Sequence, residues 1–267
     1  KRNLLQRVEG EKAERKVFCK SKAMRKNREI LKWKNNMRAL AVVICLALTM
    51  QFASGCGTTE SAQSTQENVT TIVETFDFAA VPAYDGKAYV AVNDNVPFFT
   101  EEELSSASYE TYGELDPLGR CTVCVASVGQ DLMPAEERGN IGAVKPTGWH
   151  TVKYDYVDGK YLYNRCHLIG YQLTGENANE KNLITVTRYL NIEGLLPFEN
   201  MVADYVKETD QHVMYAVTPV FECDNLLAAG VLMEGKSVED NGEGVLFCVF
   251  AYNVQPGVSI DYATGES

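Results

Sequence analysis

The chain has 267 residues, 45% of them apolar and only 8 of them proline, which excludes a disordered or low-complexity protein and leaves room for one or two domains. Its net charge of −11 is unevenly divided: residues 1–38 carry 14 Lys and Arg against 4 Asp and Glu, whereas residues 39–267 carry 11 against 32. A body this acidic repels nucleic acid unless its cations gather in one place. Between residues 138 and 191 seven Lys and Arg stand against four Asp and Glu, a clustering that chance also produces.

The first element along the chain has the form of an export signal. Residues 1–38 are basic, and an apolar segment of 15 residues, Ala39–Ala53, follows them. That segment is shorter than the ~20 residues that span a bilayer comfortably, and it is typical of the apolar core of a signal peptide. Residues 39–56 end in Ala-Ser-Gly-Cys, which resembles a bacterial lipobox, so we expect lipidation of Cys56. An uncleaved anchor helix is the alternative interpretation.

Residues 57–75 are predicted to form a flexible linker, and residues 76–267 a single folded domain. The linker is polar and rich in Ser, Thr and Gln, without an apolar period, so it cannot bury enough surface to offset its ordering entropy. A domain of the remaining length buries roughly 70% of its unfolded surface, which is enough for one stable core.

The domain contains an odd number of cysteines, which does not suggest a full disulfide framework even outside the cell. Cys121 and Cys124 form a CxxC motif, a pattern found in zinc and redox sites. They lie in an apolar, strand-like run, where an offset of three places two side chains on opposite faces, and no second CxxC follows in the sequence. We therefore expect this pair to be structural. The cysteines of the domain are Cys121, Cys124, Cys166, Cys223 and Cys248.

Short apolar runs separated by turn signals predict a domain made mainly of strands. The turn signals are Asp-Gly, Asn-Gly and Pro-Gly pairs. We expect strands at Ala88–Val92, Thr122–Val128, Lys160–Tyr163, Val213–Val220 and Val245–Val254.

Two helices are predicted among these strands. Pro197 suits the first helical position and predicts a helix that runs to about Lys207. Thr100, followed three residues later by Glu103, is a capping-box pattern and predicts the start of a second helix. Many strands with a few helices indicate the α+β class. The apolar residues expected to share the buried stripe of the first helix are Leu196, Val202, Ala203 and Val206.

The residues that can carry chemistry lie between positions 160 and 200. His167 closely follows a strand-like run, an Asn-rich loop comes next, and Asn191 precedes the helix that bears Glu199. Hydrolysis of a phosphodiester needs a base, and a neutral imidazole is a suitable one near neutral pH. One Asn carbonyl can hold a Mg²⁺ that keeps several waters, and a nearby carboxylate can orient those waters. On spacing alone, a structural histidine and a helix-capping asparagine explain the same residues.

The motif around His167 resembles a known family signature. Asn164-Arg165-Cys166-His167 is similar to the Asp-Arg-Gly-His signature of the DNA/RNA non-specific endonuclease family. The nine-residue step from Asn182 to Asn191 and the eight-residue step from Asn191 to Glu199 also match that family. The Asn-Arg-Cys-His form and the Lys-Pro-Thr-Gly-Trp segment at residues 145–149 resemble the streptococcal secreted DNase branch. The resemblance runs from about residue 119 to the end. It implies a ββα-metal (His-Me finger) core on a mainly antiparallel sheet.

The resemblance implies a role for each matched residue. His167 would be the general base, Asn191 the metal ligand, and Glu199 a carboxylate that acts on the waters of the metal. Arg165 and, upstream, Arg138 would contact phosphate through their guanidinium forks. The further residues that we expect to contact substrate are Asn164, Lys153, Lys181, Asn182 and Arg188.

The sequence departs from the family pattern at two positions. Asn164 replaces the Asp of the signature, which changes how that position supports the site. Val186 stands where we expect Gly, so the backbone before Asn191 is expected to be displaced and activity lowered. Val186 is also the best argument for an alternative function, that of a non-catalytic surface lipoprotein that binds or takes up DNA. A structural or adhesion lipoprotein is the third class.

The resemblance implies a Mg²⁺-dependent endonuclease, with Mn²⁺ as a substitute, that cuts DNA and has RNA as a further candidate substrate. It would act outside the cell, either secreted or held at the outer face of the membrane by lipid on Cys56. The chain has three histidines and no His/Cys cluster at ligand spacing, which argues against a catalytic zinc site. His150 is expected beside the substrate groove, and His212 is expected to be structural. No protein partner is predicted.

Overall fold

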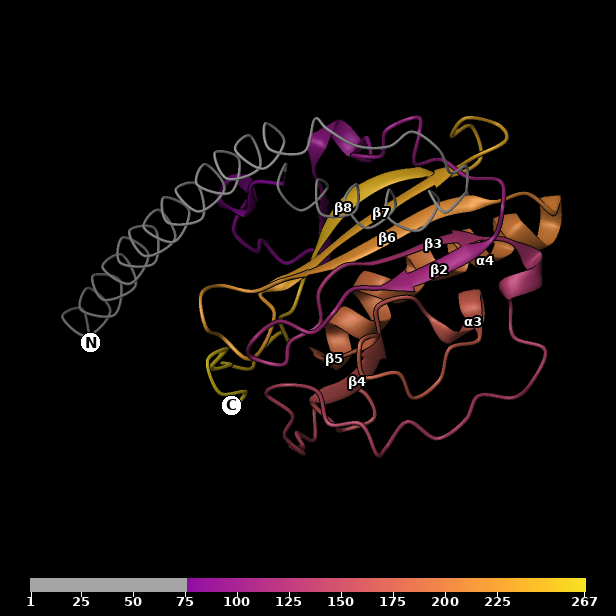
Figure 1. Ribbon diagram of the computed structural model, residues 1–267. Helices are drawn as coiled ribbons and strands as arrows, with labels where there is room; N and C mark the ends of the chain where they lie inside the picture. Colours follow the sequence, from indigo (N-terminus) through magenta and orange to yellow (C-terminus); the bar gives the residue numbers. More distant parts are fainter. Residues whose placement is uncertain (1–75) are drawn as a thin grey trace, which may run out of the picture. The chain divides into compact units, whose positions relative to one another are not determined.

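A computed structural model describes residues 76–267, which form an α+β domain (Figure 1). Six strands make an antiparallel sheet in the order β1-β8-β7-β6-β3-β2, and β4 and β5 make a separate two-stranded hairpin. The predictions for residues 1–38, 39–56 and 57–75 concern residues outside the described range. The strands are β1 Tyr89–Ala91, β2 Tyr109–Tyr112, β3 Cys124–Val128, β4 Tyr163–His167, β5 Leu183–Thr187, β6 Val213–Val220, β7 Gly230–Ser237 and β8 Leu246–Tyr252. The α-helices of this range are α3 Tyr171–Thr174 and α4 Leu196–Thr209, and a π-helical segment, Leu190–Leu195, leads into α4.

The central strands of the sheet are buried on both faces. β6 and β7 pair over their full length, from Val213 opposite Ser237 to Val220 opposite Gly230. Since side chains alternate along a strand, odd-numbered residues of β6 such as Tyr215 join the main core. Met214 joins a smaller cluster on the opposite face. Burial on both faces explains why β6 is a continuous apolar run in the sequence.

The hairpin β4–β5 and helix α4 form a ββα unit against one face of the sheet. The two strands pair from Tyr163 opposite Thr187 to His167 opposite Leu183. The chain then continues from β5 through Leu190–Leu195 into α4. In Figure 1, β4, β5, α3 and α4 lie on the same side of the large sheet. Buried residues of α4, β5 and the sheet belong to one core cluster, so packing fixes the unit that carries His167.

Most of the predicted elements are confirmed. The strands expected at residues 88–92, 122–128 and 245–254 correspond to β1, β3 and β8, and the one expected at 213–220 is β6 itself. The predicted helix at 197–207 is α4. Its buried stripe includes Phe198 in place of Leu196, which is only partly buried and faces a cavity. The α+β class and the mainly antiparallel sheet are also confirmed.

Two predicted elements are wrong. The strand expected at Lys160–Tyr163 begins only at Tyr163, because Gly159 and Lys160 have left-handed backbone, with φ of 66° and 67°, and form the turn before it. The helix expected from Thr100 is a single turn. The Glu103 carboxylate accepts from the Thr100 N–H at 2.7 Å, as in a capping box, but the serine-rich segment that follows has no apolar stripe to bury.

Cys121 and Cys124 face the same core cluster, not opposite faces, because Cys121 precedes β3 and lies outside its alternation. Their thiols donate to the carbonyl oxygens of Glu180, at 3.2 Å, and Lys181, at 3.5 Å. Both are free and buried, in agreement with a structural role. In the range 76–267 no helix is long and apolar enough to cross a membrane.

Candidate active site

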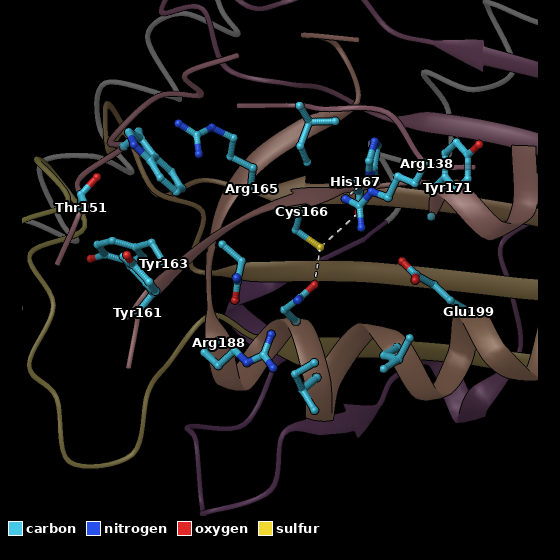
Figure 2. A pocket seen from close by; sticks show the side chains of 17 residues that line it. Arg138, Thr151, Tyr161, Tyr163, Arg165, Cys166, His167, Tyr171, Arg188 and Glu199 are labelled. Atoms are coloured by element: carbon cyan, nitrogen blue, oxygen red, sulfur yellow. Dashed lines mark hydrogen bonds between the residues drawn. The ribbon is translucent and has the colours of Figure 1, made fainter. Parts of the chain in front are cut away.

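A cavity of about 650 Å³ opens where the ββα unit meets the loop at residues 138–151. Its walls come from that loop, from β4 and from the segment between Asn191 and Glu199. In Figure 2, His167, Arg138 and Glu199 lie towards one end of the cavity, and Tyr161 and Thr151 lie at the other. Residues expected from the sequence that line it are Arg138, Asn164, Arg165, His167, Arg188, Asn191 and Glu199.

His167, at the end of β4, is held in one tautomer. Its side chain is only 4% exposed, and Nε2 lies 2.7 Å from the carbonyl oxygen of Asn177. Since a carbonyl can only accept, Nε2 carries the proton and donates it, which leaves Nδ1 of the neutral ring unprotonated. Nδ1 accepts a hydrogen bond from Arg138 Nη2 at 3.3 Å. The ring can therefore take up a proton at Nδ1.

The environment of His167 favours its neutral form. Burial lowers the pKa of the ring below its ordinary value, and the Arg138 cation lowers it further. The hydrogen bond to the Asn177 carbonyl acts in the opposite direction and raises the pKa. The sum is a base that stays unprotonated to lower pH than a free histidine.

Glu199 of α4 is a nearly buried acid at the same end of the cavity, with 8% of its surface exposed. Burial raises its pKa to about 7, although Arg138 and a hydrogen bond from Gln172 both lower it. The Gly170 backbone lies against the carboxylate, since a Cβ at residue 170 would lie 2.6 Å from Glu199 Oε2. The connection between β4 and α3 therefore limits where this carboxylate can go.

Asn191 lies in the π-helical segment before α4, and its Oδ1 accepts from the Cys166 thiol, with Sγ 2.9 Å away. Within residues 76–267 no group of three or more His, Cys, Asp or Glu is placed to hold a metal ion. The candidate donors at this end of the cavity are the Asn191 amide oxygen and the Glu199 carboxylate. This oxygen set suits a hard cation such as Mg²⁺ that keeps most of its waters, and it does not suit a tetrahedral Cys/His zinc site.

Two arginines and one asparagine line the cavity from β4 and from the residue after β5. Arg165 lies over the Trp149 ring, 3.8 Å from its centroid, and its Nε donates to the Val144 carbonyl at 2.5 Å. Arg188 donates twice to Asp158 Oδ2, at 2.9 and 2.8 Å. Asn164 Oδ1 is buried and finds no hydrogen-bond donor in the described part of the chain. Cations along the cavity suit a ligand that carries phosphates.

The other expected substrate contacts do not line the cavity. The Lys153 ammonium lies over the Tyr161 ring, 4.5 Å from its centroid. Lys181 forms an ion pair with Glu114 at 2.6 Å. Asn182 is fully buried: its Oδ1 accepts from the N–H of Ile169, and its Nδ2 donates to the carbonyl of the same residue. A substrate contact at Asn182 is therefore corrected to a structural role, the linking of β5 to the chain that follows β4.

The remaining expectations concern Val186 and two histidines. Val186 lies in β5, is fully buried in the main core and pairs with Asn164, and Asn191 nevertheless lines the cavity with His167. His150 is not among the cavity residues; its Nε2 lies 3.0 Å from the Thr264 carbonyl, which corrects the expected place beside the groove. His212 pairs with Glu239 at 2.7 Å, as a structural residue would.

Sequence reasoning did not single out Asn177, Gly170 or Tyr161. Asn177 accepts from His167 through its backbone carbonyl, which every residue type has, so the sequence does not indicate this contact. The Gly170 backbone lies close to the Glu199 carboxylate only in the folded chain. Tyr161 could have been found, because it falls two residues before Tyr163 in the alternation that leads to Arg165 and His167.

Comparison with known proteins agrees with this geometry. Residues 101–239, more than half of the chain, match the family model described as DNA/RNA non-specific endonuclease. The chain is similar to the solved structure of NucA from Streptococcus agalactiae with a magnesium ion bound, at a TM-score of 0.61 and 24% identity over 77% of this chain and 95% of NucA. It is also similar to Sda1 nuclease with a bound zinc ion, at a TM-score of 0.57 and 23% identity over 68% of this chain and 96% of Sda1.

The two structural likenesses support the fold, and the family match extends from the sheet through the ββα unit. The chain therefore belongs to the DNA/RNA non-specific endonuclease family and is a metal-dependent nuclease that hydrolyses phosphodiester bonds.

Proposed function

We propose that this nuclease is a Mg²⁺-dependent endonuclease that cleaves DNA, with RNA as a second substrate, and that His167 is its general base. The observation that carries the assignment is the hydrogen bond from His167 Nε2 to the Asn177 carbonyl. It leaves Nδ1 of the neutral ring unprotonated, and burial favours that neutral form. A neutral imidazole in a cavity lined by arginines has the properties needed to take a proton from water beside a phosphate.

Arg138 and Arg165 would bind the phosphate in this mechanism. Arg138 donates to the uncharged Nδ1 of His167 when no substrate is bound. A phosphate oxygen is a stronger acceptor than a neutral imidazole, so an entering phosphate would draw the guanidinium away and free Nδ1 to accept the proton of the attacking water. Arg165 is already held by Trp149 and Val144, so it would lose little freedom on binding the next phosphate oxygens.

Asn191 would hold the metal directly, and Glu199 would hold one of its waters. A carbonyl oxygen has two lone pairs, so Asn191 Oδ1 can accept from Cys166 and still face a cation. Bound Mg²⁺ would supply charge stabilisation for the leaving 3′ oxygen. Near neutral pH the raised pKa of Glu199 leaves part of it protonated, and a nearby cation would favour its ionised form.

The test is cleavage of plasmid DNA by the full chain with Mg²⁺ and then with EDTA. We expect cleavage only with Mg²⁺ and a loss in kcat of at least ~100-fold for His167→Ala, the usual contribution of a general base. His150→Ala is the matched control, because that histidine contacts Thr264 and is not among the cavity residues. Near wild-type cleavage by His167→Ala would reject the assignment. If the wild type retains DNA without cleaving it, a binding or uptake lipoprotein is favoured. If the wild type neither retains nor cleaves DNA, an adhesion protein is favoured.

We also propose that the nuclease acts outside the cell, as a lipoprotein on the outer face of the membrane. The support comes from the sequence: a basic stretch, an apolar segment of 15 residues and a lipobox that ends at Cys56. Secretion of the same domain without a lipid is the alternative form of this proposal.

A further inference from the structure

Tyr161 is an open aromatic ring at the end of the cavity remote from His167 (Figure 2). Its side chain is 46% exposed although it lines the cavity. Tyr163, two residues further on, differs: it is 3% exposed and its hydroxyl donates to the Gly265 carbonyl. The fold therefore uses Tyr163 for packing, whereas Tyr161 keeps nearly half of its surface open to a ligand although the Lys153 ammonium lies over its ring.

The backbone holds Tyr161 in place. Residues 153 and 161 form a β-bridge, and hydrogen bonds from Leu162 N to the Val152 carbonyl and from Tyr154 N to the Lys160 carbonyl flank it, at 3.0 and 2.9 Å. The same hairpin brings the Lys153 ammonium to 4.5 Å from the ring centroid. The β-bridge and its hydrogen bonds therefore fix the position of the exposed Tyr161 ring next to a cation.

The chemistry of the ring and the cation matches one part of a nucleic acid. A nucleobase has a flat face that stacks on an aromatic side chain, and a phosphate beside it pairs with a lysine. Bases of a duplex already stack on their neighbours, so only an unpaired base can give its face to Tyr161. His167 follows Tyr161 by six residues, at most about 20 Å of extended strand. Arg165 and Arg188 line the cavity between them in Figure 2 and can follow the intervening phosphates.

We propose that Tyr161, with Lys153 beside it, is a stacking subsite for an unpaired base a few nucleotides from the bond that is cut. The nuclease therefore prefers single-stranded to double-stranded nucleic acid. This rests on the proposed function in one respect, namely that the phosphate backbone passes through the cavity to His167.

The test compares kcat/KM of the full chain on a single-stranded oligonucleotide and on the same sequence as a duplex. Tyr161→Ala should lower kcat/KM on the single strand by about tenfold or more, mainly through KM, and change the duplex value by less than about twofold, since only the single strand has a base free to stack on the ring. Tyr161→Phe keeps the ring and should keep the preference. Tyr156→Ala is the matched control, because Tyr156 is 64% exposed on the same hairpin and does not line the cavity.

A binding measurement separates this proposal from the proposed function. In EDTA, a single strand with 2-aminopurine at one position after another should lose fluorescence at one position when it binds the wild type, and Tyr161→Ala should remove that loss. Quenching without any cleavage in Mg²⁺ would reject the nuclease assignment and leave the subsite standing. Cleavage of both substrates with equal effects of Tyr161→Ala on each, or quenching unchanged in Tyr161→Ala, would overturn the subsite alone.

Discussion

At the scale of single residues, we expect His167, as the proposed general base, and Arg138 together to set the pH range of the reaction. A general base must be unprotonated, so a lower pKa keeps His167 competent at lower pH. Burial and the Arg138 cation both lower that pKa. We expect the acid limb of kcat/KM to lie below pH 6.5, the ordinary pKa of the ring, in a profile measured from about pH 5 to about pH 8.

Arg138→Ala should move this limb to higher pH. Removal of the cation makes the protonated ring less unfavourable, so the pKa of His167 rises towards its ordinary value and protonation begins at higher pH. If Arg138 also binds phosphate, its removal lowers the maximum of kcat/KM. The pH at which the acid limb falls does not depend on that maximum. Lys207→Ala, an exposed cation on α4 outside the cavity, is the control. An unmoved limb in Arg138→Ala would show that the cation does not act on the base.

Asn191→Ala should abolish Mg²⁺-dependent cleavage and leave DNA binding in EDTA nearly intact. Asn191 is the proposed direct ligand, so its loss removes the fixed position of the metal. DNA binding would persist because it depends on cations such as Lys153 and Arg165 and on counterion release. Filter binding in EDTA and calorimetric titration with Mg²⁺ measure the two properties separately. Asn200→Ala, an exposed amide on α4, is the control, and normal cleavage by Asn191→Ala at low Mg²⁺ would place the ligand elsewhere.

Elements with an internal pattern could be predicted from the sequence, and elements defined by their partners could not. β6 begins with an apolar run, and α4 has a proline start and an apolar stripe; both lie where they are predicted. β2 and β7 were not predicted, since neither is a continuous apolar run and each is completed by pairing, with β3 and with β6. β5 was also not predicted, although its sequence Leu-Ile-Thr-Val-Thr is strand-like. The motif residues His167, Asn191 and Glu199 do meet in one cavity. Their hydrogen-bond partners could not be predicted, because backbone carbonyls and close approaches depend on the tertiary fold.

The connection between β4 and α3 offers a test of how elements position Glu199. Gly170→Ala would place a methyl group 2.6 Å from Glu199 Oε2, so the carboxylate has to move. The φ of Gly170 is −58°, which alanine adopts without strain, and the fold should persist. We expect a loss of activity of about 10- to 100-fold, typical of residues that orient the surroundings of a metal.

The control for Gly170→Ala is Gly142→Ala. Gly142 lies in the exposed part of the 138–151 loop, and a Cβ there would approach only the side chain of Asn140, at 3.0 Å. Thermal denaturation should give similar midpoints for both variants. Wild-type activity in folded Gly170→Ala would mean that the position of the Glu199 carboxylate does not matter for the reaction.

At the scale of the whole molecule, the charge distribution directs where nucleic acid can bind. Residues 39–267 carry 32 acidic against 11 basic residues, so most of the surface repels a polyanion. Arg138, Arg165 and Arg188 line one cavity, and Lys153 lies beside Tyr161, which also lines it. An acidic protein with its cations at the active site binds substrate there and little elsewhere, which suits a non-specific enzyme that must release its products.

We expect the N-terminal residues to decide where this acidic nuclease works, and Cys56→Ser tests that expectation. Cys56 lies outside the described residues, and the prediction depends on the sequence alone. If lipid on Cys56 is the membrane anchor after signal cleavage, Cys56→Ser should leave the membrane fraction. A single hydroxyl in place of the thiol cannot take the thioether-linked lipid, and the acidic domain has no attraction to an anionic membrane.

Cys45→Ser is the matched control, since Cys45 lies inside the apolar segment and upstream of the lipobox. Fractionation of cells with an immunoblot measures both location and length. A Cys56→Ser protein that stays in the membrane fraction at its full, uncleaved length would identify residues 39–53 as an anchor helix, because retention would then depend on the apolar segment and not on lipid.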